Sequence, residues 1–331
     1  MASELYVVGG EQRAPRGVAA GVADWYRFKR AIVLRVDTDS GSSRLVAEHV
    51  SPPEARPAED PAILFKSSSL SGDRLYACTQ TEVLIYSLPD LELIHYISLP
   101  FFNDLHHVIA TPSGTLLIVI SGLDMVVELR LDGTVVNEWS AIETSPWERF
   151  SREVDYRPVA TTKPHAAHPN QVFLIGQEPW ATRFEKRDAI SLIDPSRRID
   201  IAIERPHDGV VYGTDVYFTT VDGHIVIADT QTLQVRDVVD LASMHPRADL
   251  LGWTRGLYVD GNRAWVGFSR IRPTKIRENV GWVLRGFRKD IGTNIGCYDL
   301  EARKNIKQIL LEEAGLGAVF SILPAGDRSI A

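Results

Sequence analysis

The sequence predicts an all-β fold, a β-propeller of six blades that each contain four antiparallel strands. Short apolar runs rich in Val, Ile, Leu, Tyr and Phe recur along the chain, and turn-forming triplets such as Ser-Gly-Asp, Pro-Ser-Gly and Val-Asp-Gly separate them. The order of strands and turns repeats in units of about 35–50 residues, which is the size of a propeller blade. Blades must stack around an axis because one blade cannot bury both of its faces. Helical periodicity is confined to 246–252 and 303–313, where we expect no more than a turn or two.

Each of five consecutive repeats has a first strand, a more apolar second strand, a third strand that ends near Asp or Pro, and a fourth strand. These repeats are 67–97, 106–139, 168–203, 207–239, and 255–272 continued by 294–310. The sixth blade is expected to join the two chain ends. Its inner strand would be 318–326, and its three partners would be ELYVVGG, AIVLRVDTDSG and RLVAEHV near the N-terminus. Sharing the last blade in this way removes two free sheet edges.

Two other architectures fit parts of the pattern. A pair of β-sandwiches also uses short strands, but it would not repeat the same order of turns five times. Seven blades would result if the segment 140–162 contained strands. We expect one propeller domain over 1–331, with an insertion at about 270–293. Trp282 and Phe287 lie among basic residues in that insertion, which is either a lid over the channel or a contact between subunits of a homo-oligomer.

Charge and composition bear on the expected partners and compartment. The 331 residues carry a net charge of -7, and no run of Lys and Arg is long enough to form a basic face. Neither a nucleic acid nor a membrane is therefore an expected partner. Cys78 and Cys297 lie in separate apolar runs, which indicates buried thiols. The N-terminal segment lacks the pattern of a secretory signal, and no run approaches about 18 apolar residues, so we expect a cytoplasmic protein.

Ionisable residues stand just before the first strand of several repeats. His107, His168, His207 and Arg255 occupy this position in four of them. In a propeller the first strand of each blade lines the central channel, so residues at this position meet at the channel mouth. The sequence therefore predicts one pocket built from side chains that are far apart in the chain.

These residue types suit two kinds of chemistry. The neutral imidazoles of His107, His168 and His207 could ligate one divalent metal ion (Zn, Fe, Mn or Ca), with an Asp or water completing the coordination. Alternatively, one histidine acts as a general base while Arg255 binds a carboxylate or phosphate. The catalytic residues are expected to be these four and Asp208. The expected substrate-binding residues are His106, His165, Asn170, Trp180, Arg183 and Trp253.

Simpler roles fit the same residues. Each histidine could instead hydrogen-bond the backbone of a neighbouring blade, and Trp180 and Trp253 could pack between blades. Several common motifs are missing from the sequence, including G-x-S-x-G, G-x-x-x-x-G-K-[ST], G-x-G-x-x-G after a strand, and H-E-x-x-H. We therefore expect no nucleotide cofactor.

Two parts of the sequence resemble known propeller families. RPHDGVVYGTDVYFTTVDGHIVIAD (205–229) is similar to blades of the SMP-30/gluconolactonase propellers, whose members bind a divalent metal in the channel through Glu, Asn and Asp. Asp208-Gly209 matches their Pro-Asp-Gly element with His207 inserted, Asn170 matches their Asn position, and their Glu-Gly-Pro has no counterpart. GWTRGLYVDGNRAWVGFSRIR, NIGCYDLEARKNIKQI and AVFSILPAG, all within 252–326, resemble an uncharacterised bacterial propeller family. Members of that family are sometimes encoded near TPR-containing sulfotransferases, which implies a role in carbohydrate or secondary metabolism.

The sequence thus predicts an enzyme that binds a small anionic or hydroxylated metabolite at the channel mouth. Its chemistry would be that of a metal-dependent hydrolase, lyase or isomerase. The alternative is a non-catalytic propeller that binds a ligand or a partner protein at the same place.

Overall fold

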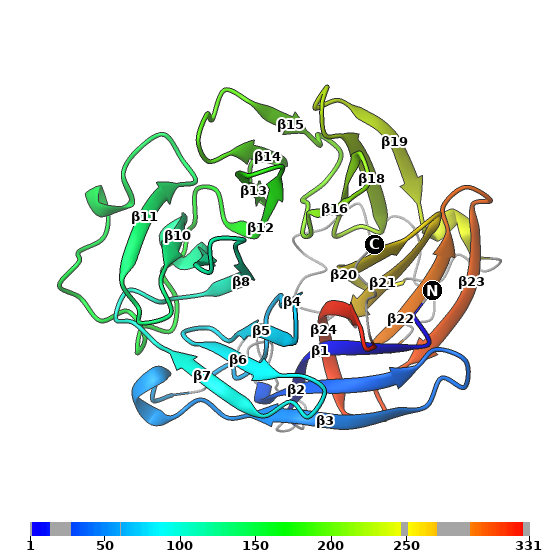
Figure 1. Cartoon of the computed structure of the whole chain (residues 1–331), viewed down its shortest axis with the longest axis horizontal. Coiled ribbons are helices and arrows are strands. Elements are labelled where there is room, and N and C mark those ends of the chain that lie inside the picture. Colours follow the sequence, from blue (N-terminus) through cyan, green and yellow to red (C-terminus); the bar gives the residue numbers. More distant parts are fainter. Residues whose placement is uncertain (1, 14–27, 60, 246–250, 270–291, 327–331) are drawn as a thin grey trace, which may run out of the picture.

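The computed structural model describes residues 2–13, 28–59, 61–245, 251–269 and 292–326. These residues form six antiparallel sheets of four strands each, arranged in a ring around a central axis (Figure 1). The predicted all-β, six-bladed propeller is therefore confirmed. Helix in the described residues is limited to short 3₁₀ turns: Pro53–Ala55 (η2), Ser121–Leu123 (η3), Pro146–Glu148 (η4) and Ala242–Met244 (η5).

Five blades follow one another along the chain, each with its inner strand first. The first two consist of β4 (Ser69–Ser71), β5 (Arg74–Cys78), β6 (Val83–Ser87) and β7 (Leu93–Ile97), then β8 (Leu105–Ala110), β9 (Leu116–Ile120), β10 (Met125–Leu129) and β11 (Val135–Ser140). The next two consist of β12 (Pro169–Ile175), β13 (Glu178–Arg183), β14 (Asp188–Ser191) and β15 (Arg198–Asp200), then β16 (Val210–Tyr212), β17 (Asp215–Thr219), β18 (His224–Asp229) and β19 (Val235–Asp240). The fifth consists of β20 (Trp253–Asp260), β21 (Arg263–Ser269), β22 (Asn294–Asp299) and β23 (Lys304–Leu310).

The sixth blade joins the two ends of the chain. Its strand order is β24 (Leu316–Pro324), β1 (Glu4–Gln12), β2 (Phe28–Asp37) and β3 (Ser43–His49). Leu5 pairs with Pro324 and Glu11 with Leu316, so the C-terminal strand is innermost, as predicted. This pairing closes the ring and removes the edges that the first and last blades would otherwise expose.

Three segments between or after the predicted blades carried separate expectations. The segment 303–313 contains the outer strand β23 instead of a helical turn, because Lys304–Leu310 pairs with β22 along its length. Beyond Ser140, the last residue of β11, the segment 140–162 contains the 3₁₀ turn η4 and no further strand, so it does not supply a seventh blade. The predicted insertion at 270–293, with Trp282 and Phe287, lies outside the described residues except for its last two.

Large apolar side chains fill the space between adjacent blades. Strand side chains alternate between the two faces of a sheet, so each blade presents one apolar set to each neighbour. Phe173 and Trp180 stack on one blade, and Phe173 meets Phe218 of the next blade edge to face, with ring centroids 5.9 Å apart. Trp180 and Trp265 are almost completely buried in these layers. The space between neighbouring blades is therefore a packed apolar core. Buried polar side chains gather along the central channel instead.

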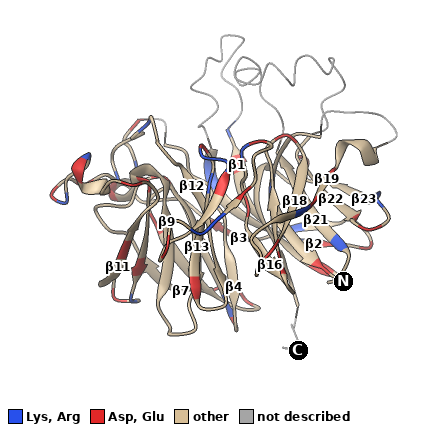
Figure 2. Cartoon of the chain, turned by 90° about the horizontal axis from the view of Figure 1, so that it is seen from above, with Lys and Arg blue, Asp and Glu red and all other residues tan. Residues whose placement is uncertain are grey.

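The surface of the described blades carries acidic and basic residues in mixed order. Figure 2, which views the disc from its side, shows Lys and Arg interspersed with Asp and Glu. Among the same residues, no helix has the length and apolar character needed to cross a membrane.

Candidate functional site

Each of the six blades contributes one side chain to a ring of residues at one mouth of the channel. Their mutual contacts define the ring. The His106 and His168 ring centroids are 4.7 Å apart, and His207 lies 6.2 Å from His106 and 6.2 Å from Phe320. The Arg255 guanidinium lies 3.8 Å, and the Lys66 ammonium 5.5 Å, from the Phe320 ring centroid. In blade order the ring is Lys66, His106, His168, His207, Arg255 and Phe320.

Bulges in four inner strands create this arrangement. The pairing register slips by one residue at His106 in β8, at Asn170 in β12, at Arg255-Gly256 in β20 and at Phe320 in β24. A bulge leaves one residue out of the ladder and redirects its side chain. Three of the ring residues are therefore bulge residues.

The bulge in β8 also explains why the predicted histidine of that blade is displaced by one position. His106 is the extra residue between the paired Leu105 and His107, and it faces His168 and His207. Nδ1 of His107 instead accepts the backbone N–H of Val172 at 3.3 Å, between two inner strands. Burial lowers the pKa of His107 to about 3. His107 is thus a neutral hydrogen-bond acceptor in the structure, which matches the simpler role considered for it above.

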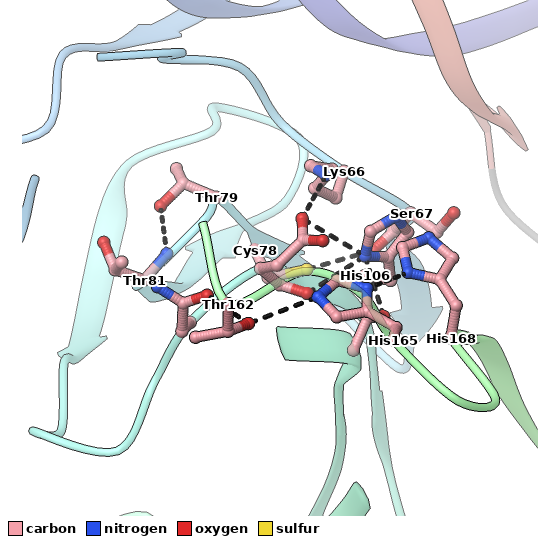
Figure 3. Close-up of polar contacts among 12 residues, drawn as sticks. Lys66, Ser67, Cys78, Thr79, Thr81, His106, Thr162, His165 and His168 are labelled. Atoms are coloured by element: carbon pink, nitrogen blue, oxygen red, sulfur yellow. Dashed lines mark hydrogen bonds and ion pairs between the residues drawn. The ribbon is translucent and has the colours of Figure 1, made fainter. Parts of the chain in front are cut away.

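One group in the described chain could hold a metal ion. It consists of Asp104, His165 and His168, whose potential ligand atoms all lie within 4.8 Å of one another. Figure 3 shows the two imidazoles beside His106. The Lys66 ammonium donates to the Asp104 carboxylate at 2.9 Å. Of the predicted trio His107, His168 and His207, only His168 belongs to this group. His165 was expected to contact substrate, and Asp104 was not among the predicted metal ligands.

Asp124 holds the loop that carries both histidines of the metal group. Its carboxylate accepts backbone N–H groups from Ala166 at 2.7 Å, Ala167 at 3.0 Å and His168 at 2.6 Å. Asp124 itself is 3% exposed. His168, Asp104 and Asp124 all have φ near +50°, a conformation that costs non-glycine residues about 1–3 kcal/mol each. Such strain persists where surrounding contacts fix the backbone, as the three hydrogen bonds to Asp124 do here.

A chain of hydrogen bonds assigns the tautomers of His165 and His168. The Thr162 hydroxyl donates to the Gly122 carbonyl at 2.5 Å, so it accepts Nε2–H of His165 at 3.2 Å. The other nitrogen of a neutral His165 then accepts Nδ1–H of His168, and these two Nδ1 atoms are 2.6 Å apart. Nε2 of His168 consequently carries a lone pair rather than a proton.

The same reasoning applies to His106. The Ser121 hydroxyl donates to the Pro169 carbonyl, so it accepts Nδ1–H of His106 at 2.9 Å, and the Asp104 carbonyl is a second acceptor at 3.0 Å. Nε2 of a neutral His106 therefore also carries a lone pair. Backbone and hydroxyl partners of this kind commonly orient histidine ligands of metals.

The electrostatics of the site keep the imidazoles neutral. Burial lowers the pKa of His165, and it lowers the pKa values of His106, His168 and His207 far below the usual range. Burial alone would raise the pKa of Asp104, but the Lys66 ammonium, 2.9 Å away, and the neighbouring imidazoles together outweigh it and hold that pKa well below its ordinary value. The site thus combines an ionised carboxylate with neutral imidazoles, which is the protonation state that metal ligands need.

His207 and Asp208 precede β16, the inner strand of the blade that follows the one led by His168. His207 is 3% exposed, and its Nδ1 has no hydrogen-bond partner among the described residues. The Asp208 carboxylate accepts the Gly256 N–H at 3.0 Å and the Thr219 hydroxyl, and burial raises its pKa to about 6. Gly256 has φ +81°, so the β20 bulge depends on a residue without a side chain at this point. Asp208 therefore ties the start of β16 to the bulge that presents Arg255.

The remaining predicted substrate-binding residues have different positions. Trp180 is fully buried between blades, and the guanidinium of Arg183 forms a buried ion pair with Asp188 at 2.6 Å. Neither side chain borders the ring. Trp253 stacks on Phe184 with ring centroids 6.3 Å apart, and Phe184 packs on His168 at 5.4 Å, so Trp253 supports one wall of the site.

Asn170 is completely buried beside the ring at the start of β12. Its Nδ2 donates to the Pro206 carbonyl at 3.2 Å, while Oδ1 has no hydrogen-bond partner in the described part of the chain. The amide therefore links the starts of two neighbouring inner strands, and its oxygen is left for a ligand or water.

Sequence reasoning missed five contributors to the site: Lys66, Asp124, Thr162, Phe184 and Phe320. Lys66 directly follows the apolar run 62–65, and a cation at this place just before an inner strand is a signal that could have been used. The other four carry no such signal, because their positions depend on contacts between distant segments.

Comparisons with known proteins support the fold. The crystal structure of a protein of unknown function from Bacteroides caccae is similar with a TM-score of 0.60 and 13% identity, over 97% of this chain and 98% of that one. A functionally unknown protein from Desulfotomaculum acetoxidans is similar with a TM-score of 0.50 and 11% identity, over 97% of this chain and 90% of the other. Virginiamycin B lyase from Staphylococcus aureus matches with a TM-score of 0.46 and 13% identity, over 71% and 69% of the two chains. At these identities the likeness concerns the fold alone.

Sequence comparisons add no family. No protein-family model matches the chain, and no curated protein matches its sequence. The expected relationships to SMP-30/gluconolactonase propellers and to the uncharacterised bacterial family thus stay expectations, while the propeller that both implied is present.

Proposed function

We propose that the channel mouth is the active site of a metal-dependent enzyme that acts on a small metabolite. The observation that carries this proposal is the convergence of Asp104, His165 and His168, whose potential ligand atoms lie within 4.8 Å of one another. One carboxylate and two imidazoles are three protein ligands, the number typical of catalytic sites that leave a position open for water or substrate.

The donor set favours a transition metal. Imidazole nitrogen suits Zn, Fe, Mn and similar ions, whereas Ca²⁺ takes oxygen ligands almost exclusively. Two metal–nitrogen bonds of about 2.1 Å at a tetrahedral angle place the nitrogens roughly 3.4 Å apart. Nε2 of His168 has its lone pair available, whereas Nδ1 of His165 accepts Nδ1–H of His168 at 2.6 Å, so coordination by His165 Nδ1 requires this hydrogen bond to open.

The surrounding residues fit hydrolytic, eliminating or isomerising chemistry. A bound divalent metal would supply a Lewis acid that polarises a carbonyl or lowers the pKa of water. His207 is buried and neutral, and its Nδ1 has no hydrogen-bond partner in the described part of the chain, so it is the best-placed proton acceptor beside the metal group. Phe184 and Phe320 provide apolar walls, which limit water around the reacting groups.

Metal analysis of the purified protein tests this proposal. After reconstitution with Zn²⁺, Mn²⁺ or Co²⁺, the wild-type protein should contain one equivalent of metal by elemental analysis. His168→Ala and Asp104→Ala should each lose it while keeping the circular dichroism spectrum. His95→Ala is the matched control, because His95 hydrogen-bonds the Leu131 carbonyl on the outer strand β7, away from the ring.

Turnover assays then separate an enzyme from a binding module. Metal-dependent conversion of lactones, carboxylic esters or phosphate esters that disappears in His207→Ala supports the enzyme. A protein that binds metal and ligand without converting any of them is the binding module of the alternative interpretation. A wild-type protein that takes up no metal contradicts the proposal.

A further inference from the structure

The metal-ligand carboxylate is already engaged by a buried cation. The Lys66 ammonium lies 2.9 Å from Oδ1 of Asp104, and the two side chains are 8% and 18% exposed. A divalent ion bound to the same carboxylate would face this ammonium at close range in a poorly screened environment. Metal and Lys66 therefore compete for Asp104.

The formal charges around the ring determine the net charge that the site would have with a divalent metal bound. The described site has two cations, Lys66 and Arg255, and three carboxylates, those of Asp104, Asp124 and Asp208. Asp124 and Asp208 are already turned toward backbone N–H groups, on the 166–168 loop and on Gly256 respectively. Imidazoles that ligate a metal are neutral and add no charge, so a divalent metal makes the site net positive. A buried site with excess positive charge is stabilised by an anion.

Both cations, Lys66 and Arg255, lie over the aromatic ring of Phe320. Arg255 stacks on Phe320 at 3.8 Å, and Lys66 lies 5.5 Å from the same ring centroid. The His207 ring centroid lies 6.2 Å from that of Phe320, and Nδ1 of His207 is buried without a hydrogen-bond partner among the residues that the structure describes. A guanidinium, an ammonium and an imidazole around one aromatic ring are a recognition set for a carboxylate, phosphate or sulfate oxygen.

We propose that Lys66 is a switch that couples metal binding to anion binding. Without metal, its ammonium pairs with Asp104. When a metal takes Asp104, the flexible Lys66 side chain turns to an anionic group of the ligand, which it holds together with Arg255. The ligand class is thus a metabolite with an oxyanion, and metal and ligand bind with positive cooperativity. By linkage, each should raise the affinity for the other by the same factor. This inference rests on the proposed metal site.

Co²⁺ titrations of the full-length protein test the coupling. Binding is followed by the visible absorption of the histidine-bound ion, in chloride, sulfate or acetate buffers of equal ionic strength. For the wild type we expect sulfate, acetate or both to increase Co²⁺ affinity about 5- to 50-fold over chloride. An effect of sulfate alone indicates a phosphate-like group, and an effect of acetate alone indicates a carboxylate.

Lys66 variants test whether this residue couples metal binding to anion binding. Lys66→Met should bind Co²⁺ more tightly in chloride, because the competing cation is gone, and should lose the anion effect. Lys66→Arg should keep the anion effect, and it remains informative if Lys66→Met fails to fold. Lys163→Met is the control, because Lys163 contributes positive charge near His165 and His168 but lies on the exposed side of the loop. It should keep the anion effect.

The outcomes separate this inference from the metal proposal. If the wild type binds Co²⁺ with equal affinity in all buffers, or if Lys66→Met keeps the anion effect, the coupling is overturned and the metal site stands. If no variant and no wild-type protein binds Co²⁺ in any buffer, the metal site itself is overturned, and the coupling with it.

Discussion

The carboxylate of Asp124 accepts a 2.6 Å hydrogen bond from the backbone N–H of His168, across 44 residues of sequence. This contact is the best-defined support of the site, because Asp124 also accepts the N–H groups of the two preceding residues. An acidic side chain at the turn between β9 and β10 thereby sets the conformation of the loop that supplies two of the three candidate metal ligands.

Asp124→Asn should weaken metal binding without touching a ligand. The amide has one acceptor oxygen in place of two, and its NH₂ group would meet backbone N–H donors. We expect a loss of about 1.5–3 kcal/mol in the free energy of unfolding and a roughly 10- to 100-fold loss of Co²⁺ affinity. Urea unfolding and Co²⁺ titration measure the two effects. Asp132→Asn, at an exposed turn where Asp132 accepts the Thr134 N–H, is the control that should change neither strongly. Unchanged Co²⁺ affinity in Asp124→Asn would show that the loop is held by other contacts.

His106 and His107 should respond differently to the same substitution. His106→Gln removes a lone pair beside His168, so we expect weaker Co²⁺ binding, by about tenfold or more, and little loss of stability. His107→Gln disturbs the acceptor of the Val172 N–H, so it should cost about 1 kcal/mol of stability and leave Co²⁺ affinity unchanged. Co²⁺ titration measures the change in affinity, and urea unfolding measures the change in stability. Loss of metal in His107→Gln with retention in His106→Gln would mean that the β8 bulge does not orient these residues as described.

The pH dependence of metal binding should be shallow near neutrality. Ligand imidazoles in water take up protons near pH 6.5, and metal binding weakens below that value. Burial lowers the pKa values of His165 and His168, and Lys66 keeps Asp104 ionised, so protons compete only at lower pH. Co²⁺ affinity should therefore change less than about threefold between pH 7.5 and 6.5. A tenfold fall over that interval would indicate imidazoles with ordinary pKa values.

Glu82 should stabilise the fold in a pH-dependent way, independently of the site. Its buried carboxylate accepts bonds from His49, Thr79 and Ser51, and Tyr96 adds a fourth at 3.1 Å. Burial alone would raise the pKa of Glu82, but these donors together lower it below the usual value of 4.5. Because the folded state holds the proton less tightly than the unfolded state, this stabilisation is complete above pH 4.5 and is lost as the pH falls through the lower folded pKa.

Glu82→Gln tests this pH-dependent stabilisation by Glu82. It should cost about 1.5–3 kcal/mol at pH 7, and the difference from wild type should shrink below about pH 4. Urea unfolding at the two pH values measures both quantities, and Glu54→Gln, in the first turn of η2, is a control. A difference that stays constant with pH would show that the charge of Glu82 contributes nothing.

The local pattern of the chain was sufficient to predict the architecture. Strand alternation and turn-forming triplets are short-range properties, and they identified the blades from 67–97 onward and the pairing of the two chain ends. The repeat also indicated that the residues before the inner strands meet at one mouth of the channel, where His168, His207 and Arg255 do lie close to one another. For a fold built from repeated units, position in the repeat determines position around the axis.

Only the tertiary structure decided which atoms face the site. A bulge depends on the register between two strands, so a one-residue shift separates His106 from His107 without any mark in the sequence. Lys66, Asp124 and Phe320 reach the site through contacts across as many as 253 residues, such as the Ser67 hydroxyl bond to the Phe320 carbonyl. The sequence by itself determined the blades and the position of His168, His207 and Arg255 near the starts of inner strands. The candidate metal ligands could be identified only from the folded structure. Burial, strand register and the distances between charges all depend on contacts between segments that are far apart in the sequence.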